Sequence, residues 1–409
     1  MEINSSVIKN VIQNEDIYTV FQPIVNIKSR RIVGVEALSR GLYNGGTINP
    51  YFLFEYAHSL KMTAKLDDIC RKKAEKIFAK SSEKMMLFVN FDNYILQEIV
   101  DFDQIFSKDF TESILPENIV IEVVGGSPSD LRLMKFIRFC RQKGFLIAID
   151  RVNKENSSLN LITSVRPDIV KIDSEILHDI DKDFDKKSIF NSIVSVANSV
   201  GATVIADGTE TIEEVVTCVL CGVDFFQGFF FAKAMPLKRL QEVDLSEKLS
   251  AVESSMSSRI KQKRQLELSD KELHLELIKD FAAELSSTEK GQYFAAMSRF
   301  AAENDCVNCV FLLDENGVQI TDTISGNNAF FKTAMPLFKT SGIGDTHSIK
   351  NYFYAVRECI QDPFVSDWYV SNSTGNLCKI ASSKFIDQDG QVVIACIDIK
   401  SENKILEGV

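Results

Sequence analysis

The stretch IVKIDSEILHDIDKDFDKKSIFNSIVSVANSVGATVIAD, residues 169–207, contains the pattern that repeats through the first part of the chain. Its two apolar runs, Ile169–Ile172 and Thr203–Ala206, are too short for helices and rich in Val and Ile, so they predict strands. Between them, Lys187–Val200 has the apolar spacing of an amphipathic helix. A strand, a helix and a second strand in this order predict a repeating β/α unit.

The same alternation extends outward over residues 1–240. Eight strands are predicted, at Tyr18–Val25, Arg31–Ala37, Met86–Phe91, Ile119–Val123, Phe145–Ile149, Ile169–Ile172, Thr203–Ala206 and Phe225–Phe229. Further helices are predicted at Asp68–Lys80, Ser129–Lys143 and Thr211–Cys221. Eight strands separated mainly by helices indicate an α/β fold, a (β/α)8 barrel of the TIM type, with a doubly wound sheet as the second choice.

Polar residues lie at or just beyond the carboxyl ends of these runs, where barrel enzymes build their sites. One acid after a strand is more often a turn residue or a helix cap, but a series of them indicates convergence on one site. The series comprises Glu36, Asn90, Glu122, Asp150, Lys171, Asp173, Asp207 and Gln227.

Carboxylates together with one amide suit hard divalent cations, which prefer oxygen ligands. We expect Glu36, Asn90, Glu122 and Asp150 to bind one Mg²⁺, Mn²⁺ or Ca²⁺. Such an ion lowers the pKa of a bound water and neutralises a phosphate. Lys171 would then contact a phosphate oxygen or the attacking water, which makes a phosphodiester the leading substrate class.

Composition limits the alternatives. The chain has 409 residues and a net charge of −11, so broad attraction to DNA or to anionic lipid is not expected. We found neither an apolar run of the roughly 18–20 residues that span a bilayer nor a signal peptide, and we expect a cytoplasmic protein. The nine Cys are expected to be reduced. For the pairs Cys218/Cys221 and Cys306/Cys309, simple burial is favoured over a joint zinc site.

Composition changes near Val243, which predicts three parts: a barrel domain over 1–243, a helical linker over 244–290 and a small α+β domain over 291–409. Residues 244–290 are rich in Lys, Glu and Ser and carry apolar residues at spacings of three and four, which predicts one long helix or two shorter ones. Packing of this helix on its neighbours and a dimerising signalling role are equally favoured. In the last part we expect central strands at Val307–Asp314 and Val392–Ile399 and a helix at Asn351–Gln361.

At the polar residues the chain resembles the EAL domain, the family of cyclic di-GMP phosphodiesterases, over roughly residues 10–240. The resemblance rests on eight blocks in the order and approximate spacing of the family: FQPI (21–24), VEALSR (35–40), FVNF (88–91), IEVV (121–124), AID (148–150), VKID (170–173), ADGTET (206–211) and VDFFQGFFFAKAMP (223–236).

This resemblance implies a barrel that binds cyclic di-GMP across its mouth and opens the ring to linear pGpG. It implies Mg²⁺ or Mn²⁺ as cofactor, with Ca²⁺ as a possible inhibitory ion. Roles carried over from the family make Lys171, Asp207 and Glu210 catalytic. They make Gln22, Leu38, Arg40, Asp173 and Gln227 ligand contacts.

The chain departs from the family pattern at the second metal. Arg151 stands where the family has a second Asp, Asp207 is shorter than the usual Glu, and Gly125 replaces a bracing Glu. A positive charge about 4 Å from a cation costs on the order of 4 kcal/mol at an effective dielectric of about 20. If Arg151 points inward, it could itself contact the phosphate. If it faces solvent, Asp173 or Glu155 could serve the second ion instead.

The last third is similar to the domain that follows the EAL domain in YkuI-like proteins, which is of the PAS and Cache type. The similarity rests on Tyr352-Phe353, on Pro363–Tyr369, on Ser382–Lys384, on Asp389-Gly390 and on Asp398. It implies a sensory or dimerisation domain. Its aromatic residues are expected to pack in a core rather than to line a small-molecule pocket.

Three hypotheses follow for this signalling protein. In the first, it binds cyclic di-GMP with weak or lost hydrolysis and passes its occupancy along the linker to an unknown downstream protein. In the second, it is an active metal-dependent phosphodiesterase regulated by the C-terminal domain, whose own small ligand is unknown. In the third, it is an interaction module that no longer binds nucleotide. Arg151, Asp207 and Gly125 favour the first over the second. A homodimer is expected in each case.

Overall fold

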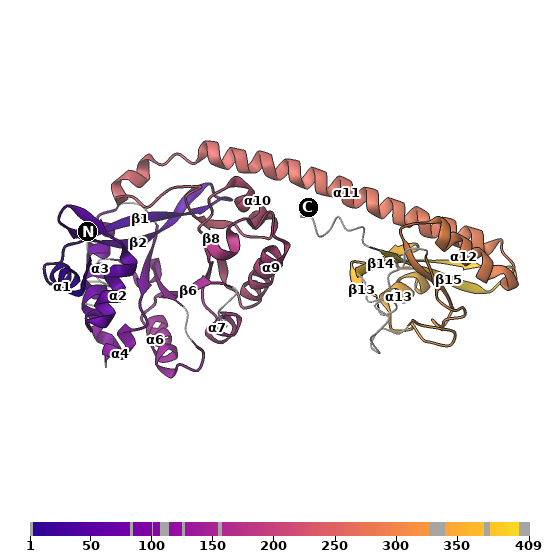
Figure 1. Ribbon diagram of the computed structural model, residues 1–409, viewed down its shortest axis with the longest axis horizontal. Coiled ribbons are helices and arrows are strands. Elements are labelled where there is room, and N and C mark those ends of the chain that lie inside the picture. Colours follow the sequence, from indigo (N-terminus) through magenta and orange to yellow (C-terminus); the bar gives the residue numbers. More distant parts are fainter. Residues whose placement is uncertain are drawn as a thin grey trace. The chain divides into compact units, whose positions relative to one another are not determined.

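The computed structural model describes residues 3–81, 85–99, 101–106, 114–124, 127–153, 158–326, 340–371 and 377–400. The chain divides into two compact units, residues 1–257 (unit 1) and 258–409 (unit 2) (Figure 1). The three-part division expected from the sequence stays a prediction, and the boundary between the two units falls inside a helix. None of the described helices is long and apolar enough to cross a membrane.

Unit 1 is a closed eight-stranded barrel, as the sequence predicts. Its strands are β1 (Ile17–Asn26), β2 (Arg31–Tyr43), β4 (Met86–Phe91), β5 (Ile119–Val124), β6 (Leu146–Val152), β7 (Ile169–Ile172), β8 (Thr203–Asp207) and β9 (Phe225–Gln227), and β3 (Gly46–Ile48) extends β2 as a hairpin. From β2 through β4 to β9 the neighbours are parallel, and pairing of β1 with both β2 and β9 closes the barrel.

The first strand differs from a regular (β/α)8 barrel, because β1 is antiparallel to both of its neighbours. Only residues 27–30 connect β1 to β2. A parallel pair needs a crossover of a dozen or more residues, so this short connection permits only a hairpin.

Helices surround the barrel (Figure 1). They are α1 (Ser5–Gln13), α2 (Pro50–Ser59), α3 (Thr63–Phe78), α4 (Ile95–Glu98), α6 (Leu131–Gln142), α7 (Ser158–Val165), α8 (Ser174–Leu177), α9 (Phe184–Ser199) and α10 (Ile212–Leu220). Short 3-10 turns lie at η1 (Phe102–Gln104), η2 (Pro116–Asn118) and η3 (Leu237–Glu242). The largest apolar core lies between strands and helices, and includes Phe136, Phe190 and Val215.

A smaller core fills the inside of the barrel. Six strands each contribute one buried residue to it: Ile24, Phe88, Val120, Ala148, Ile169 and Ile205. Because side chains along a strand alternate between two faces, the residues two positions farther along share this inward face. That places Asn90, Glu122 and Lys171 directly above the apolar layer.

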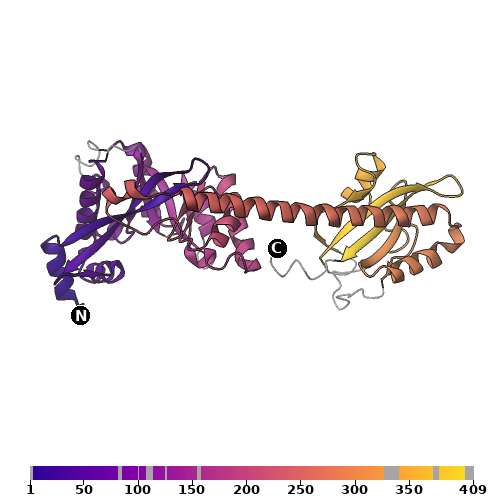
Figure 2. The ribbon, with the colours of Figure 1, turned by 90° about the horizontal axis from the view of Figure 1, so that it is seen from above.

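The predicted linker forms one continuous helix, α11 (Ser246–Ser286), visible as a single uninterrupted element in Figure 2. Leu249 and Val252 near its start are buried in the core of unit 1. Phe281 and Leu285 near its end are buried in the core of unit 2. The sequence therefore predicts the helix correctly, and packing with both cores stabilises its two ends.

Unit 2 is built on an antiparallel sheet with strand order β11-β10-β15-β14-β12 and with β13 paired to β14. Its strands are β10 (Val307–Asp314), β11 (Ile324–Ser325), β12 (Phe364–Val365), β13 (Tyr369–Val370), β14 (Leu377–Ile386) and β15 (Val392–Lys400), and its helices are α12 (Tyr293–Glu303) and α13 (Asn351–Arg357), with a 3-10 turn η4 (Lys290–Gln292). One face of the sheet packs against α11 and α12, and the other against α13.

The aromatic residues of the resemblance pack in a core as expected, except for Trp368, which is half-buried outside both described cores of unit 2, with Lys379 Nζ 4.7 Å from its ring centroid. Tyr352 and Phe353 are buried in the core beneath α13, and Tyr369 packs against them. The two CxxC pairs lie in different units, since Cys218 lies on α10 of unit 1 and Cys309 on β10 of unit 2. All nine cysteines are free thiols.

Candidate functional site at the barrel mouth

The polar residues predicted to converge line the inside of the barrel, at the carboxyl ends of the parallel strands. Glu36 comes from β2, Asn90 from β4, Glu122 from β5, Asp150 from β6, Lys171 from β7, Asp207 from β8 and Gln227 from β9. They form one polar layer above the apolar residues of the barrel interior, as the alternation of side chains requires.

Lys171 lies at the centre of this layer with its side chain only 1% exposed. Its Nζ is 2.8 Å from Glu36 Oε2 and 2.7 Å from Glu122 Oε1. It also lies 3.4 Å from Asp207 Oδ2 and 3.8 Å from Asp150 Oδ1. Burial alone would lower the pKa of Lys171, but the surrounding carboxylates outweigh it and raise that pKa well above its usual value. The ammonium is therefore charged.

Glu36 is the most completely bonded carboxylate. Asn90 Nδ2 donates to its Oε1 at 2.6 Å, and Gln227 Nε2 donates to its Oε2 at 2.6 Å. Burial would raise the pKa of Glu36, but the charge of Lys171 and the donated hydrogen bonds overcome it and lower that pKa to about 2. Gln227 Nε2 also reaches Gln22 Oε1 at 3.3 Å, which links β9 to β1.

The ionised forms of Glu122, Asp150 and Asp207 are less well stabilised than that of Glu36. Glu122 Oε2 and Asp150 Oδ1 are buried and accept no hydrogen bond from the described residues. Burial raises the pKa of Glu122 and of Asp150, and it raises that of Asp207 to about 7 although its side chain is 28% exposed. When all four carboxylates are ionised, one ammonium leaves a formal excess of three negative charges.

This donor set fits a divalent cation, because unpartnered buried oxygens and excess negative charge are what such an ion neutralises. The carboxylates of Glu36, Glu122 and Asp150 now surround the Lys171 ammonium instead. Among the described residues, no group of three His, Cys, Asp or Glu side chains is arranged to hold a metal ion. The predicted metal set therefore stays a prediction.

Arg151 lies in an irregular part of β6. The pairing of β6 with β7 shifts register between Ile149 and Val152, so Asp150 and Arg151 form a bulge beside Lys171. Arg151 has a φ of +52°, a left-handed conformation that few residues other than Gly, Asn and Asp adopt readily. Its side chain is 65% exposed, and its Nε lies 3.9 Å from Asp150 Oδ2.

The remaining predicted residues lie around this layer without joining it. Asp173 caps α8 by accepting a hydrogen bond from the Glu175 backbone N–H at 2.8 Å. Glu210 is exposed, and no described hydrogen bond or ion pair connects its carboxylate to Lys171. Leu38 and Arg40 follow Glu36 along β2 and are half-buried, and Arg40 donates to the Ser39 carbonyl at 2.9 Å.

Two positions that sequence reasoning did not single out fix the loops around the site. Glu214 on α10 is buried and accepts from the backbone N–H groups of Glu210 at 2.7 Å and Thr211 at 3.1 Å. Thr211 and Glu214 form a capping box, a spacing that the sequence does contain. Gly228 lies so close to Thr209 that an added Cβ would be 2.1 Å from the Thr209 carbonyl oxygen.

One expected departure, Gly125, lies outside the described residues, and so does Glu155. The suggestion that Glu155 serves a second ion therefore stays untested.

The model of the EAL domain family matches residues 6–234. Among curated proteins, the chain is 26% identical over 249 residues to the probable cyclic di-GMP phosphodiesterase PdeG of Escherichia coli, a match covering 59% of this chain and 49% of PdeG. It is 22% identical over 388 residues to the uncharacterized EAL-domain containing protein YkuI of Bacillus subtilis, covering 91% of this chain and 93% of YkuI. It thus spans about half of PdeG and nearly all of YkuI.

Among solved structures, the crystal structure of B. subtilis YkuI in complex with cyclic di-GMP and calcium matches with a TM-score of 0.77 and 21% identity, over 98% of this chain and 100% of that one. The EAL enzyme Bd1971, in a form bound to cAMP and cyclic di-GMP, matches with a TM-score of 0.54 and 25% identity, over 59% of this chain and 68% of that one. The family match covers more than half of this chain and includes every residue of the polar layer. The chain belongs to the EAL domain family.

Proposed function

We propose that this protein binds cyclic di-GMP at the barrel mouth and hydrolyses it weakly or not at all. The observation that carries the proposal is Arg151, a cation in the bulge beside Asp150, at the position where the family places a second acid. A positive charge there opposes a second divalent ion, and the two-metal arrangement that activates water and stabilises the leaving oxygen depends on that ion.

Binding is supported by the intact remainder of the site. Glu36, Asn90, Glu122 and Asp150 would hold one Mg²⁺ or Mn²⁺, and an ion bound there would replace the Lys171 ammonium as partner of the carboxylates. When bound, the ion would supply positive charge for a phosphate and acidify a bound water. The exposed guanidinium of Arg151 is free to turn toward a phosphate oxygen, a contact that guanidinium geometry favours.

Within the chain's own residues, Lys171 would stabilise negative charge that develops on the phosphate, because its ammonium is held charged. Gln227 and Asn90 would keep Glu36 ionised and oriented through their two hydrogen bonds. These groups suit tight binding of a phosphodiester and do not by themselves supply a second ion.

An active cyclic di-GMP phosphodiesterase is the second candidate. The exposure of Arg151 favours it, because a side chain in solvent leaves space for a second ion. In that case Asp207 and Asp173 would be the acids that serve it, and Glu210 would complete the catalytic group. The third hypothesis, an interaction module without nucleotide, has no such observation in its favour.

The test is an incubation of the full chain with cyclic di-GMP and Mg²⁺ or Mn²⁺, followed by chromatography of bound and free nucleotide. We expect intact dinucleotide to be retained by the wild type and lost in Glu36→Ala. Linear pGpG formed at catalytic rates by the wild type, and absent with Glu36→Ala, would overturn the proposal in favour of the phosphodiesterase.

Two substitutions at one position separate charge from backbone strain. Arg151→Asp restores an acid and Arg151→Asn does not, yet both residues tolerate the left-handed conformation. We expect Arg151→Asp to raise turnover at least tenfold over Arg151→Asn. Equal rates in the two folded, nucleotide-binding variants would show that Arg151 does not limit hydrolysis.

For unit 2 we propose a sensory or dimerisation domain of the PAS or Cache type. Its support is an antiparallel sheet with helices on both faces, together with the near full-length likeness to YkuI. The homodimer is a prediction that sedimentation of the full chain would test directly.

A further inference from the structure

The first turns of α11 are part of the barrel rather than a free linker. Leu245, Leu249 and Val252 are buried in the main core of unit 1. Because they follow one another at spacings of four and three, they place one face of the helix against the barrel. Any movement of this segment therefore has to change contacts within unit 1.

Three polar residues on these turns reach two different parts of the barrel. Lys248 Nζ donates to the Phe231 carbonyl oxygen at 2.8 Å, just beyond β9. Glu253 forms an ion pair with Arg30, which stands in the turn between β1 and β2. Ser250 Oγ lies 3.5 Å from the same guanidinium. We call Lys248, Ser250 and Glu253 the helix latch.

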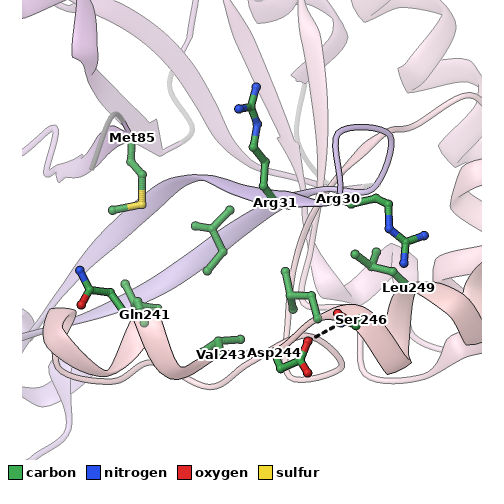
Figure 3. A pocket seen from close by; sticks show the side chains of 11 residues that line it. Arg30, Arg31, Met85, Gln241, Val243, Asp244, Ser246 and Leu249 are labelled. Carbon is green, nitrogen blue, oxygen red and sulfur yellow. Dashed lines mark hydrogen bonds between the residues drawn. The ribbon is translucent and has the colours of Figure 1, made fainter. Parts of the chain in front are cut away.

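A pocket that is open to solvent lies beside the helix latch. Its volume is about 550 Å³, and it lies between the β1–β2 turn and the start of α11 (Figure 3). In Figure 3 the Arg30 side chain points toward α11, whereas Arg31 points away from it. The apolar part of the lining comprises Ile32, Met85, Leu240, Val243, Leu245 and Leu249. The space is open to solvent, so on this side the first turn of α11 borders water rather than close-packed side chains.

The two parts held by the helix latch both carry residues of the polar layer. In the β1–β2 hairpin, Gln22 pairs directly with Glu36. Gln227 ends β9 and donates hydrogen bonds to both of those side chains. The helix latch thus contacts the β1–β2 turn and the segment after β9, and these two elements carry the side chains that meet at Glu36.

We propose that the helix latch is a positioning device, which transmits the state of unit 2 through α11 to Gln22, Glu36 and Gln227. This inference rests on the proposed function, since the positioned residues are those of the cyclic di-GMP site. The far end of α11 is fixed in unit 2, where Phe281 and Leu285 are fully buried. The Arg30–Glu253 pair is 39% and 65% exposed, so it is weak enough to open and close with a small change in α11.

The first test compares two double variants of the full chain. Lys248→Met/Glu253→Gln removes the polar contacts, and Lys238→Met/Glu247→Gln changes the same residue types at exposed positions with no described hydrogen bond or ion pair. We expect backbone hydrogen exchange in residues 17–26 and 225–232 to rise at least threefold only in the helix-latch variant. We expect its dissociation constant for cyclic di-GMP to rise at least threefold as well.

Rescue separates the ion pair from local packing. In the charge-swapped variant Arg30→Glu/Glu253→Arg, the rate of backbone hydrogen exchange and the affinity for cyclic di-GMP should lie within about twofold of the wild type. Either single charge reversal should leave both outside that range. Unchanged exchange in the helix-latch variant, or identical effects in its control, would overturn the proposal.

The second test starts from unit 2. Phe281→Ala removes a buried ring at the far end of α11, and we expect exchange in residues 17–26 to rise at least twofold when the helix latch is intact. In the helix-latch variant, Phe281→Ala should cause no further rise in hydrogen exchange of residues 17–26. If Phe281→Ala raised hydrogen exchange in residues 17–26 equally in the wild type and in the helix-latch variant, or in neither, the proposed transmission through α11 would be overturned.

The outcomes also distinguish the two proposals. If the wild type fails to bind cyclic di-GMP while exchange follows the expected pattern, the helix latch stands and the proposed function fails. If the wild type binds and exchange is unchanged by the helix-latch variant, the proposed function stands and the positioning device is excluded.

Discussion

At the scale of single residues, the dominant feature of unit 1 is one lysine among four acids. Lys171 is buried with its ammonium within 3.8 Å of Glu36, Glu122, Asp150 and Asp207. Removing one partner of a buried ion pair is far more costly than breaking an exposed one, because the remaining charge has no solvent. The stability of the barrel and its capacity for cations are therefore linked at this residue.

We expect Lys171→Met to lower the free energy of unfolding by about 3–5 kcal/mol in the absence of divalent cations, because three or four carboxylates lose their counter-charge. Added Mn²⁺ should raise the stability of this variant more than that of the wild type. Urea denaturation with and without Mn²⁺ measures both effects. The exposed Lys9→Met is the control, and an equal loss in that variant would contradict the interpretation.

A second buried pair predicts a pH dependence. Asp67 and Arg71 on α3 form an ion pair at 2.9 Å, and both side chains are buried. Burial raises the pKa of Asp67 from 3.8 to about 6, so the folded state holds this proton more tightly than the unfolded chain does. Its contribution to stability is full below about pH 4 and is lost as pH rises through 6.

We therefore expect the stability of the wild type relative to Asp67→Asn to fall by about 1.4 kcal/mol between pH 5 and pH 7.5, since one unit of pKa corresponds to about 1.4 kcal/mol. Chemical denaturation at several pH values measures the difference. Asp68→Asn, at the neighbouring half-buried position on α3, is the matched control substitution. If the stability of the wild type relative to Asp67→Asn rose with pH instead, the raised pKa of Asp67 would be contradicted.

At the scale of elements, the strands and the closed barrel were predictable, and the direction of the first strand was not. All eight barrel strands lie where short Val- and Ile-rich runs predict them, because the runs are too short to form helices. The antiparallel direction of β1 follows from its connection to β2, which has only four residues. The sequence shows that the two predicted strands are close together, but we did not use this spacing to predict their direction. Helices α1 and α2 were missed, although α1 carries Val7, Ile8, Val11 and Ile12 at helical spacing over its nine residues.

The site shows a similar division. Glu36, Asn90, Glu122, Asp150 and Lys171 could be placed together, because the carboxyl ends of parallel strands meet at one side of a barrel. The position of the Lys171 ammonium among the acids and the bulge at Arg151 could not, because both depend on packing between strands distant in sequence. Glu210 is exposed, a placement that the motif alone does not reveal.

Gly228 tests how closely two loops must approach. An added Cβ would lie 2.1 Å from the Thr209 carbonyl oxygen, so Gly228→Ala must separate the loops after β8 and β9. We expect a loss of about 3 kcal/mol in stability and weaker nucleotide binding, because Gln227 is next in the chain. Gly222→Ala, with nothing within 4 Å, should cost only about 1 kcal/mol. Calorimetry and equilibrium binding measure both, and equal costs would contradict the interpretation.

At the scale of the whole molecule, the described residues of the two units form separate apolar cores, and α11 contributes side chains to both. Leu249 belongs to the core of unit 1, and Phe281 to a core of unit 2. Buried area within each unit, rather than the helix between them, therefore supplies most of the stability.

We expect two thermal transitions, each sensitive to one of two substitutions in the same helix. Leu249→Ala should lower the transition of unit 1 by the equivalent of about 2–5 kcal/mol, and Phe281→Ala that of unit 2 by about 3–5 kcal/mol. Scanning calorimetry of the two variants provides the measurement. A single transition shifted equally by both would show one cooperative domain instead.

The closing strand pair has a consequence for synthesis of the protein on the ribosome. The first strand, β1, bonds along one edge to β9 and, through Phe21, to Met235, more than 200 residues later. The nascent chain cannot close its barrel before β9, which ends at Gln227, has left the exit tunnel. Until then β1 and β8 each present an open edge, the kind of surface that recruits other strands and that chaperones cover. A chain truncated before β9 would thus be an aggregation-prone fragment rather than a smaller working domain.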